Sequence, residues 1–220
     1  MKLIKKSLQL CSHIYDNPSS DYIIRNEVDY CAMCLHQKTL YVVFRGTDNW
    51  KGWKSNFRYS DFNKDNVHDG FQIAYNKIEK RIFNYINTQR GIEHIVYTGH
   101  SRGGVLAILA AYDHGYQYYT LGCQTISCIT FGAPRLGGKK WRETINRHSD
   151  FYLTRVEVPG DPVCGVPLRS MGYRKEGNVL ILKTPWWWNL GTLPIIRVWK
   201  HHPNVYMKAV EYTERKNKKC

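Results

Sequence analysis

The sequence has no hydrophobic run of the roughly 20 residues that a membrane-spanning helix needs. Its basic start, residues 1–17, contains only a short apolar stretch and no small-residue cleavage site, so we expect no secretory signal there. The apolar positions of this segment instead recur at the period of a short amphipathic helix. These features predict a protein that is cytoplasmic or peripheral to membranes.

The sequence also lacks the closely spaced cysteines of a disulfide scaffold or a zinc site. Its seven cysteines are an odd number, scattered from Cys11 to Cys220, which is typical of reduced thiols in a reducing compartment. Cys31 and Cys34 form a C-x-x-C pair, but they lie in a strand-like segment, where residues three apart point to opposite faces. Since no second pair follows, we expect ordinary buried thiols and no metal site.

Acidic residues are scarce: 18 Asp and Glu stand against 32 Lys and Arg, which gives a formal net charge of +14. This excess favours anionic partners, namely nucleic acid, acidic lipid headgroups or acidic proteins. The basic residues are spread along the chain apart from a tail at 215–219, which we expect to be a frayed, solvated terminus. No basic and aromatic motif of a known module accompanies the charge, so we expect no nucleic-acid partner.

Internal repeats and low-complexity tracts are absent as well, and a chain of 220 residues with 43% hydrophobic content suits a single domain over 1–220. Segments with strand and helix patterns alternate along it. We expect strands at 27–37, 39–45, 93–97, 125–131, 151–158 and 178–183, and helices at 3–14, 71–86, 101–112, 139–146 and 203–212. This order predicts an α/β fold with a mostly parallel central sheet, helices on both faces and an antiparallel hairpin at one edge.

One short motif indicates nucleophilic chemistry. Gly99-His100-Ser101-Arg102-Gly103 lies between the strand-like IVYT and the helix-like GVLAILAAY. A serine on such a turn exposes its hydroxyl, the glycines let strand and helix approach, and the helix N-terminus presents N–H groups to developing negative charge. The motif therefore predicts Ser101 as a nucleophile, with an ordinary helix-capping serine as the alternative.

A serine nucleophile requires a base, and the base requires an orienting carboxylate. In open α/β hydrolases the acid and then the histidine follow the serine, at the carboxyl ends of later strands. Asp161 stands in a Pro/Gly turn just past the strand expected at 151–158. The other acidic residues that we compared with it lie in helices, before or within that strand, or too late in the chain, so Asp161 is the predicted acid.

The base is expected from the pair His201-His202. His114 ends the helix expected after the serine and His148 precedes the acid, so neither suits the role. Pro203 at the first helical position makes His202 the expected N-cap and leaves His201 on the preceding loop. We predict His201 as the base and keep His202 as the alternative.

Six stretches, in order, resemble the class 3 lipase family, the fungal-type α/β-hydrolase lipases. They are VVFRGTDNW (42–50), VHDGFQIAY (67–75), VYTGHSRGG (96–104), ITFGAPRLGG (129–138), VPGDPVCGVP (158–167) and HHPNVYMKAV (201–210). The resemblance implies the α/β-hydrolase fold and hydrolysis of acyl-lipid esters through an acyl-enzyme. It implies Ser101 as the nucleophile and Asp161 as the acid of the catalytic triad. The triad histidine would be His201 or His202, which precede the tyrosine of the last motif. The resemblance implies no metal or organic cofactor.

The resemblance also implies an oxyanion hole. Its donors would be the backbone N–H groups of Thr47, which ends the FRGT segment, and of Arg102, which follows the serine. The family usually has leucine after the serine, so Arg102 is a departure. Its charge favours anionic substrates such as phospholipids, or else its side chain folds away to a nearby carboxylate.

Family members carry a lid after the oxyanion segment. Here residues 48–62 combine tryptophan and phenylalanine with Lys51, Lys54 and Arg58, a mixture suited to an anionic lipid surface. The apolar loop 184–199 contains three consecutive tryptophans, which cannot all face one core, so we expect at least one at the surface. The structural alternative is that both segments pack over the sheet edge, and the functional alternative is a non-catalytic lipid-binding or scaffold protein.

Overall fold

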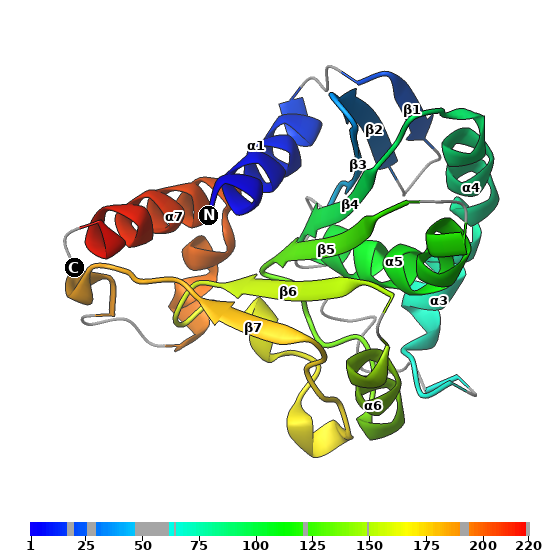
Figure 1. Cartoon of the computed structure of the whole chain (residues 1–220). Coiled ribbons are helices and arrows are strands. Elements are labelled where there is room, and N and C mark those ends of the chain that lie inside the picture. The colour runs from blue at the N-terminus through cyan, green and yellow to red at the C-terminus, as the bar shows by residue number, and fades with distance from the viewer. Residues whose placement is uncertain are drawn as a thin grey trace.

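The computed structural model describes residues 1–16, 20–25, 30–46, 62–63, 65–120, 123–148, 150–189 and 194–218. These residues contain a seven-stranded sheet whose strands follow one another in chain order (Figure 1). The strands are β1 (Tyr22–Arg25), β2 (Tyr30–His36), β3 (Thr39–Phe44), β4 (His94–His100), β5 (Thr125–Phe131), β6 (Tyr152–Glu157) and β7 (Asn178–Ile181). The pairs β1–β2 and β2–β3 are antiparallel and all later pairs are parallel. The predicted mostly parallel sheet is confirmed, and β1 is an edge strand that the sequence did not predict.

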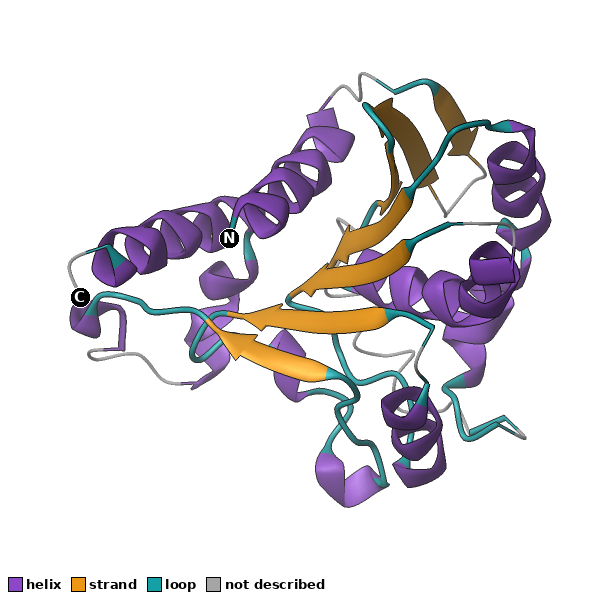
Figure 2. Cartoon of the chain, in the orientation of Figure 1, coloured by secondary structure: helices purple, strands orange, loops and turns teal. Residues whose placement is uncertain are grey.

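Helices cover both faces of the sheet (Figure 2). Those in the connections between parallel strands are α3 (Asp69–Asn76), α4 (Glu79–Thr88), α5 (Arg102–Thr120) and α6 (Lys139–Arg147). Right-handed crossovers between strands that advance in one direction place these four helices on one face. The chain ends, α1 (Lys2–Asp16) and α7 (Pro203–Asn217), lie side by side on the other. Each face therefore has its own hydrophobic cluster.

The helix predicted over 71–86 is interrupted, because α3 ends at Asn76 and α4 begins at Glu79. Its apolar positions Ala74, Ile78 and Ile82 recur every four residues, and each such step drifts by about 40° around a helix of 3.6 residues per turn. One straight helix would carry them progressively away from the core. The break at Lys77 and Ile78 restores their burial.

Two helices extend further than predicted. α5 continues past Tyr112 to Thr120, so His114 lies within it and bonds Tyr97 Oη through Nδ1 (3.1 Å) and Tyr75 Oη through Nε2 (3.3 Å). α7 includes residues 215–217, where the sequence predicted a frayed tail. Helical hydrogen bonding thus continues into the basic segment, with Lys218 N–H donating to Glu214 O at 3.1 Å.

The six described cysteines are free thiols. Cys31 belongs to the cluster beneath α3–α6, whereas Cys34 packs on the cluster beneath α1 and α7, so the two sulfurs face opposite sides of β2. Within the described ranges no group of three His, Cys, Asp or Glu side chains could hold a metal ion. In the same ranges no helix is long and apolar enough to cross a membrane.

The role of α1 as a cover for the sheet predicts unequal effects of truncating two leucines of that helix. Leu8 is completely buried and Leu3 is 40% exposed. Leu8→Ala is expected to lower the free energy of unfolding by about 2–5 kcal/mol, because it leaves a cavity against the sheet. Leu3→Ala should change it by no more than about 0.5 kcal/mol. Urea denaturation measures both, and equal effects would mean that α1 does not cover the core.

Candidate active site

Ser101 occupies a strained turn between β4 and α5. Its φ is +59°, in the left-handed region that non-glycine residues rarely adopt. Its N–H donates to Phe131 O at 2.9 Å, and its carbonyl accepts from Gly104 N at 3.0 Å. The residue as a whole is only 5% exposed, because the turn sits among neighbouring strand ends.

Glycines permit this turn because other backbone segments pass directly against it. A Cβ added at Gly103 would collide with the carbonyl oxygen of Phe44 at the end of β3. A Cβ added at Gly99 would collide with the backbone of Gly103 itself. The glycines therefore allow strand, turn and helix to approach closely, as the motif predicted.

Asp161 lies in the turn after β6 and is 7% exposed. Its Oδ2 accepts hydrogen bonds from His201 Nδ1 (2.9 Å) and Tyr206 Oη (2.6 Å). Its Oδ1 accepts from the backbone N–H of Val163 at 2.9 Å. Burial alone would raise the pKa of Asp161, but the bonds from His201, Tyr206 and Val163 outweigh it, so the pKa lies below its usual value. The carboxyl group is therefore a carboxylate at neutral pH.

The two adjacent histidines have different positions at the start of α7. His202 is the N-cap, and its Nδ1 accepts from Asn204 N–H at 3.2 Å, with Pro203 at the first helical position. This confirms the predicted helix start. His201 lies just before the cap, is 9% exposed, and directs Nδ1–H to Asp161. A neutral His201 imidazole in this tautomer presents Nε2 as a proton acceptor.

Ser101, Asp161 and His201 all lie against the carboxyl end of β5. Gly132, directly after β5, has a φ of +60°. A Cβ there would lie 2.9 Å from His201 Nδ1 and 3.0 Å from Asp161 Oδ2. The preceding residue, Phe131, accepts from Ser101 N–H. The end of β5 thus contacts the serine on one side and the His–Asp pair on the other.

A buried arginine anchors the loop that begins at Gly132. Arg155 on β6 is 1% exposed and donates to the carbonyl groups of Ala133 (2.5 Å) and Pro134 (2.9 Å). It also forms an ion pair with Glu176 at 2.7 Å. Charge-assisted hydrogen bonds of this kind in a buried setting are short and directional, so they hold the loop beside the His–Asp pair.

His100 contacts both the backbone and the ring of His201, and the sequence did not predict this contact. The Nε2 of His100 lies 2.6 Å from His201 O, and the two rings are 4.5 Å apart. Its Nδ1 lies 3.3 Å from Tyr15 Oη of α1. Burial, together with the positive charge that His201 can carry, lowers the pKa of His100 to about 3. His100 is therefore neutral, donates Nε2–H to the carbonyl, and accepts from Tyr15.

Tyr206 is a second partner that the residues alone did not identify. Besides its bond to Asp161, its hydroxyl oxygen accepts from Val158 N–H at 3.4 Å and lies 3.6 Å from Cys164 Sγ. The side chain is completely buried on the first turn of α7. Its appearance in the last family-like motif was the available signal, but no pattern in the sequence relates it to the carboxylate.

The proposed oxyanion donors are only partly described. Thr47 and residues 48–61 lie outside the described residues, and with them Lys51, Lys54 and Arg58 of the predicted lid. Arg102 is the first residue of α5, so its N–H belongs to a helix N-terminus. Arg102 as a whole residue is only 7% exposed. Phe62, at the end of the predicted lid segment, packs against Tyr173 with ring centroids 4.5 Å apart and ring planes tilted by 41°.

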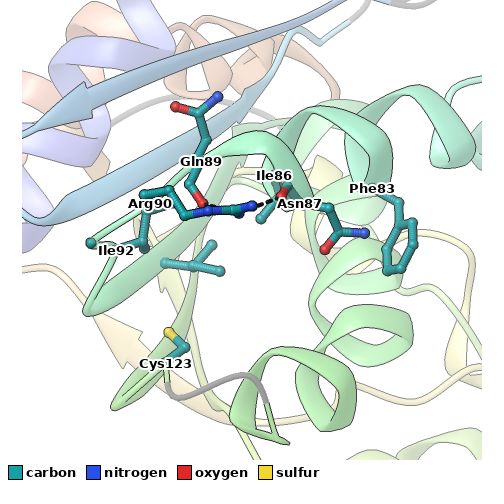
Figure 3. A pocket seen from close by; sticks show the side chains of 9 residues that line it. Phe83, Ile86, Asn87, Gln89, Arg90, Ile92 and Cys123 are labelled. Carbon is teal, nitrogen blue, oxygen red and sulfur yellow. Dashed lines mark hydrogen bonds between the residues drawn. The ribbon is translucent and has the colours of Figure 1, made fainter.

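A pocket of about 570 Å³ lies elsewhere, beside α4 and the amino ends of β4 and β5 (Figure 3). Arg90 lies along its wall with Nη1 bonded to Asn87 O (2.9 Å) and Gln89 O (3.2 Å). Ile95 of β4 lines the pocket, and a strand rise of 3.3 Å per residue places it roughly 20 Å from Ser101. The thiol of Cys123 in this pocket has a raised pKa because of burial, so it is not an activated nucleophile.

Comparisons with known proteins find related sequences. Residues 41–171 match the sequence model of the family described as Lipase (class 3). A lipase of Rhizopus niveus is 28% identical over 167 residues, which are 72% of this chain and 40% of that protein. Phospholipase A1-II 1 of Oryza sativa subsp. japonica is 27% identical over 176 residues, which are 76% of this chain and 41% of that protein. The chain thus spans about 40% of the length of the curated relatives it matches.

Solved structures show the same fold. Lipase II from Rhizopus niveus superposes with a TM-score of 0.69 at 22% identity, covering 83% of this chain and 82% of that one. The mono- and diacylglycerol lipase from Aspergillus oryzae gives a TM-score of 0.70 at 20% identity, covering 84% and 80%. These likenesses establish the predicted α/β-hydrolase fold.

Two glycines of α5 test the packing around the serine turn. Gly103→Ala is expected to lower the free energy of unfolding by about 2 kcal/mol or more, because the new Cβ meets Phe44 O. At Gly115 the nearest atom to a new Cβ is Phe151 Cδ1, at an ordinary 3.5 Å. Gly115→Ala should therefore stabilise the helix by about 0.5–1 kcal/mol. Thermal and urea unfolding measure both variants, and a harmless Gly103→Ala would contradict the close approach.

Proposed function

The chain belongs to the class 3 lipase family, and from this we propose that it is a serine carboxylic ester hydrolase that cleaves acyl esters of lipids. One observation carries the proposal: the 2.9 Å bond from His201 Nδ1 to the buried carboxylate of Asp161, next to the strained Ser101 turn. This bond fixes the imidazole in the tautomer that accepts a proton at Nε2.

In the proposed acylation step, Ser101 Oγ attacks the ester carbonyl carbon and His201 Nε2 takes the hydroxyl proton. The tetrahedral intermediate carries negative charge on the former carbonyl oxygen, and His201 carries positive charge. Asp161 stabilises that imidazolium and holds its ring in place without taking the proton. When the intermediate collapses, the imidazolium gives its proton to the leaving alcohol, which leaves an acyl-enzyme on Ser101.

Deacylation repeats the sequence with water. His201 removes a proton from the water as the oxygen attacks the acyl carbon, and it then returns the proton to Ser101 Oγ, releasing the fatty acid. The backbone N–H groups of Arg102 and Thr47 are the proposed oxyanion donors in both steps. Removing a donor of this kind typically slows an enzyme by about 10²–10³ in kcat. These steps need no metal or organic cofactor.

Acyl lipids are the proposed substrate class. The relatives include proteins named lipase and phospholipase A1, so triacylglycerols and phospholipids are both candidate substrates. Other relatives are named secreted mono- and diacylglycerol lipases, whereas a cytoplasmic or membrane-peripheral location of this chain remains a prediction. The formal charge of +14 favours anionic partners, and for an enzyme of acyl lipids we propose an anionic lipid surface as the place of action. We expect no nucleic-acid partner, because the sequence carries no basic and aromatic motif of a known nucleic-acid-binding module.

Replacing the proposed nucleophile and acid tests the activity directly. Ser101→Ala should abolish hydrolysis of short- and long-chain esters, while the thermal unfolding midpoint changes little because one oxygen is lost. Asp161→Asn should lower kcat by about 10⁴, because the amide favours the wrong imidazole tautomer. A substrate panel of triacylglycerols, phospholipids and soluble esters provides the rates. Near-normal rates in folded Ser101→Ala would reject the assignment, and an inactive wild-type protein across the panel would favour a non-catalytic scaffold.

The neighbouring histidines provide a matched pair. His201→Ala is expected to be as damaging to kcat as Ser101→Ala, because members of a triad act as a unit. His202→Ala should retain far more activity and lose about 1 kcal/mol of stability, since it removes the N-cap bond to Asn204. Steady-state kinetics and urea unfolding on both proteins separate these outcomes. An active His201→Ala beside an inactive His202→Ala would reverse the assignment.

A further inference from the structure

The C-terminal end of α7 carries aromatic and basic side chains that the proposed chemistry does not use. The short 3-10 helix η3 (Trp186–Asn189) lies beside this end of α7, close to the point marked C in Figure 1. Two bonds join α7 to Lys183, which lies three residues before η3: Lys183 N–H donates to Thr213 Oγ1 at 2.9 Å, and Lys183 Nζ donates to Asn217 Oδ1 at 2.8 Å. These bonds hold the segment that leads into η3 against α7.

A recess of about 620 Å³ opens between these two segments. It is lined by Pro185, Trp187, Tyr212, Arg215, Lys216 and Lys218. The three cationic residues are exposed, and Lys216 Nζ lies 5.6 Å from the centroid of the Tyr212 ring. Among the described residues that line the recess, none is acidic. Aromatic walls with three cations fit a phosphate or carboxylate group that is attached to an apolar body.

Two tryptophans extend this surface towards solvent. Trp186 is 70% exposed and Trp187 is 56% exposed, and their rings meet edge to face at 6.0 Å. Trp188 instead packs on the core beneath α1 and α7 and contacts Trp199 at 5.5 Å. This confirms the prediction that at least one of the consecutive tryptophans lies at the surface. Indole rings are favoured at the headgroup level of a bilayer, where one side is apolar and the other is wet.

Acidic residues nearby do not cancel the positive charge. Glu214 lies 3.9 Å from Lys5 of α1, so a lysine from the other terminal helix faces it. Glu211, one turn earlier on α7, is exposed. The cations at 215, 216 and 218 and Lys183 outnumber these two acids. The surface therefore complements negative charge.

We propose that this surface docks the protein onto an anionic phospholipid bilayer. We call it the η3–α7 face, formed by Trp186, Trp187, Arg215, Lys216 and Lys218. A headgroup phosphate or carboxylate occupies the recess, and the two indole rings enter the headgroup layer. α7 runs from the base-bearing turn to this face, and at 1.5 Å per residue its 15 residues span about 22 Å. The role of docking in catalysis rests on the proposed function, whereas the binding itself does not.

The test uses sedimentation of the full chain with vesicles of phosphatidylcholine, with or without about 30% phosphatidylserine. The variant Arg215→Gln/Lys216→Gln/Lys218→Gln is expected to bind the anionic vesicles at least tenfold more weakly than wild type at low salt. Binding of wild type should also fall at high salt, since exposed charges are screened. Trp186→Ser/Trp187→Ser should weaken binding as well, because the rings no longer enter the headgroup layer.

A control variant with the same net charge separates docking from overall attraction. Lys77→Gln/Lys80→Gln/Arg81→Gln removes three exposed cations from α4 and the connection before it, on the opposite face of the sheet. Each triple variant lowers the formal charge from +14 by three. We expect the control to change vesicle binding by less than threefold. Equal weakening in the two triple variants would overturn the proposal.

Further arms exclude other occupants. Inorganic phosphate at millimolar concentration should not displace the protein from anionic vesicles, and displacement would show a site for the free ion instead. The proposal would also be overturned if wild type bound neutral and anionic vesicles equally. It would likewise be overturned if wild type bound duplex DNA and only the Arg215→Gln/Lys216→Gln/Lys218→Gln variant lost that binding. Hydrolysis of a soluble short-chain ester is measured in parallel. An inactive wild type that still needs the η3–α7 face for vesicle binding would reject the proposed function and leave docking supported.

Discussion

The hydrogen bond from His201 to Asp161 is held in place by contacts from several elements of the fold. A carboxylate that is 7% exposed remains ionised only because His201, Tyr206 and a backbone N–H all donate to it. Two of those donors come from the start of α7 or the turn before it. The position of a terminal helix is therefore as important to the proposed chemistry as the serine turn. His100 adds a third support by donating to the carbonyl of His201.

The sheet topology explains why the chain ends are needed. Strands that advance in one direction through right-handed crossovers place α3, α4, α5 and α6 on a single face. The opposite face would expose Val43, Val96 and Ile129 to water without α1 and α7. The helix that covers this face thus also delivers the base, and its partner α1 delivers Tyr15 to His100. The packing of α7 on this face therefore positions His201 and Tyr206 beside Asp161.

Much of this arrangement follows from local sequence patterns. Local backbone chemistry determines three of its features, so the sequence predicted them. They are the glycine-flanked turn at Ser101, the turn after β6 that contains Asp161, and the start of α7, with His202 as the N-cap and Pro203 as the first helical residue. The bonds from Tyr206 to Asp161 and from His100 to His201 join residues 45 and 101 positions apart, and no local pattern contains them. The break between α3 and α4 was missed because apolar residues four apart look like one face of a single helix. Their angular position around the helix axis shifts with every repeat, however, and over several turns they leave that face. Thr47 lies outside the described residues and stays a prediction.

In the proposed mechanism, the imidazole of His201, held by Asp161, activates the hydroxyl of Ser101. Covalent labelling with a fluorophosphonate tests it most directly, because this probe reports an activated serine without any assumption about the lipid substrate. Peptide mass spectrometry should place the phosphonyl adduct on Ser101 in wild type and in His202→Ala, with labelling of His201→Ala slowed by orders of magnitude. An adduct on another residue, or equally fast labelling of folded His201→Ala, would contradict the account.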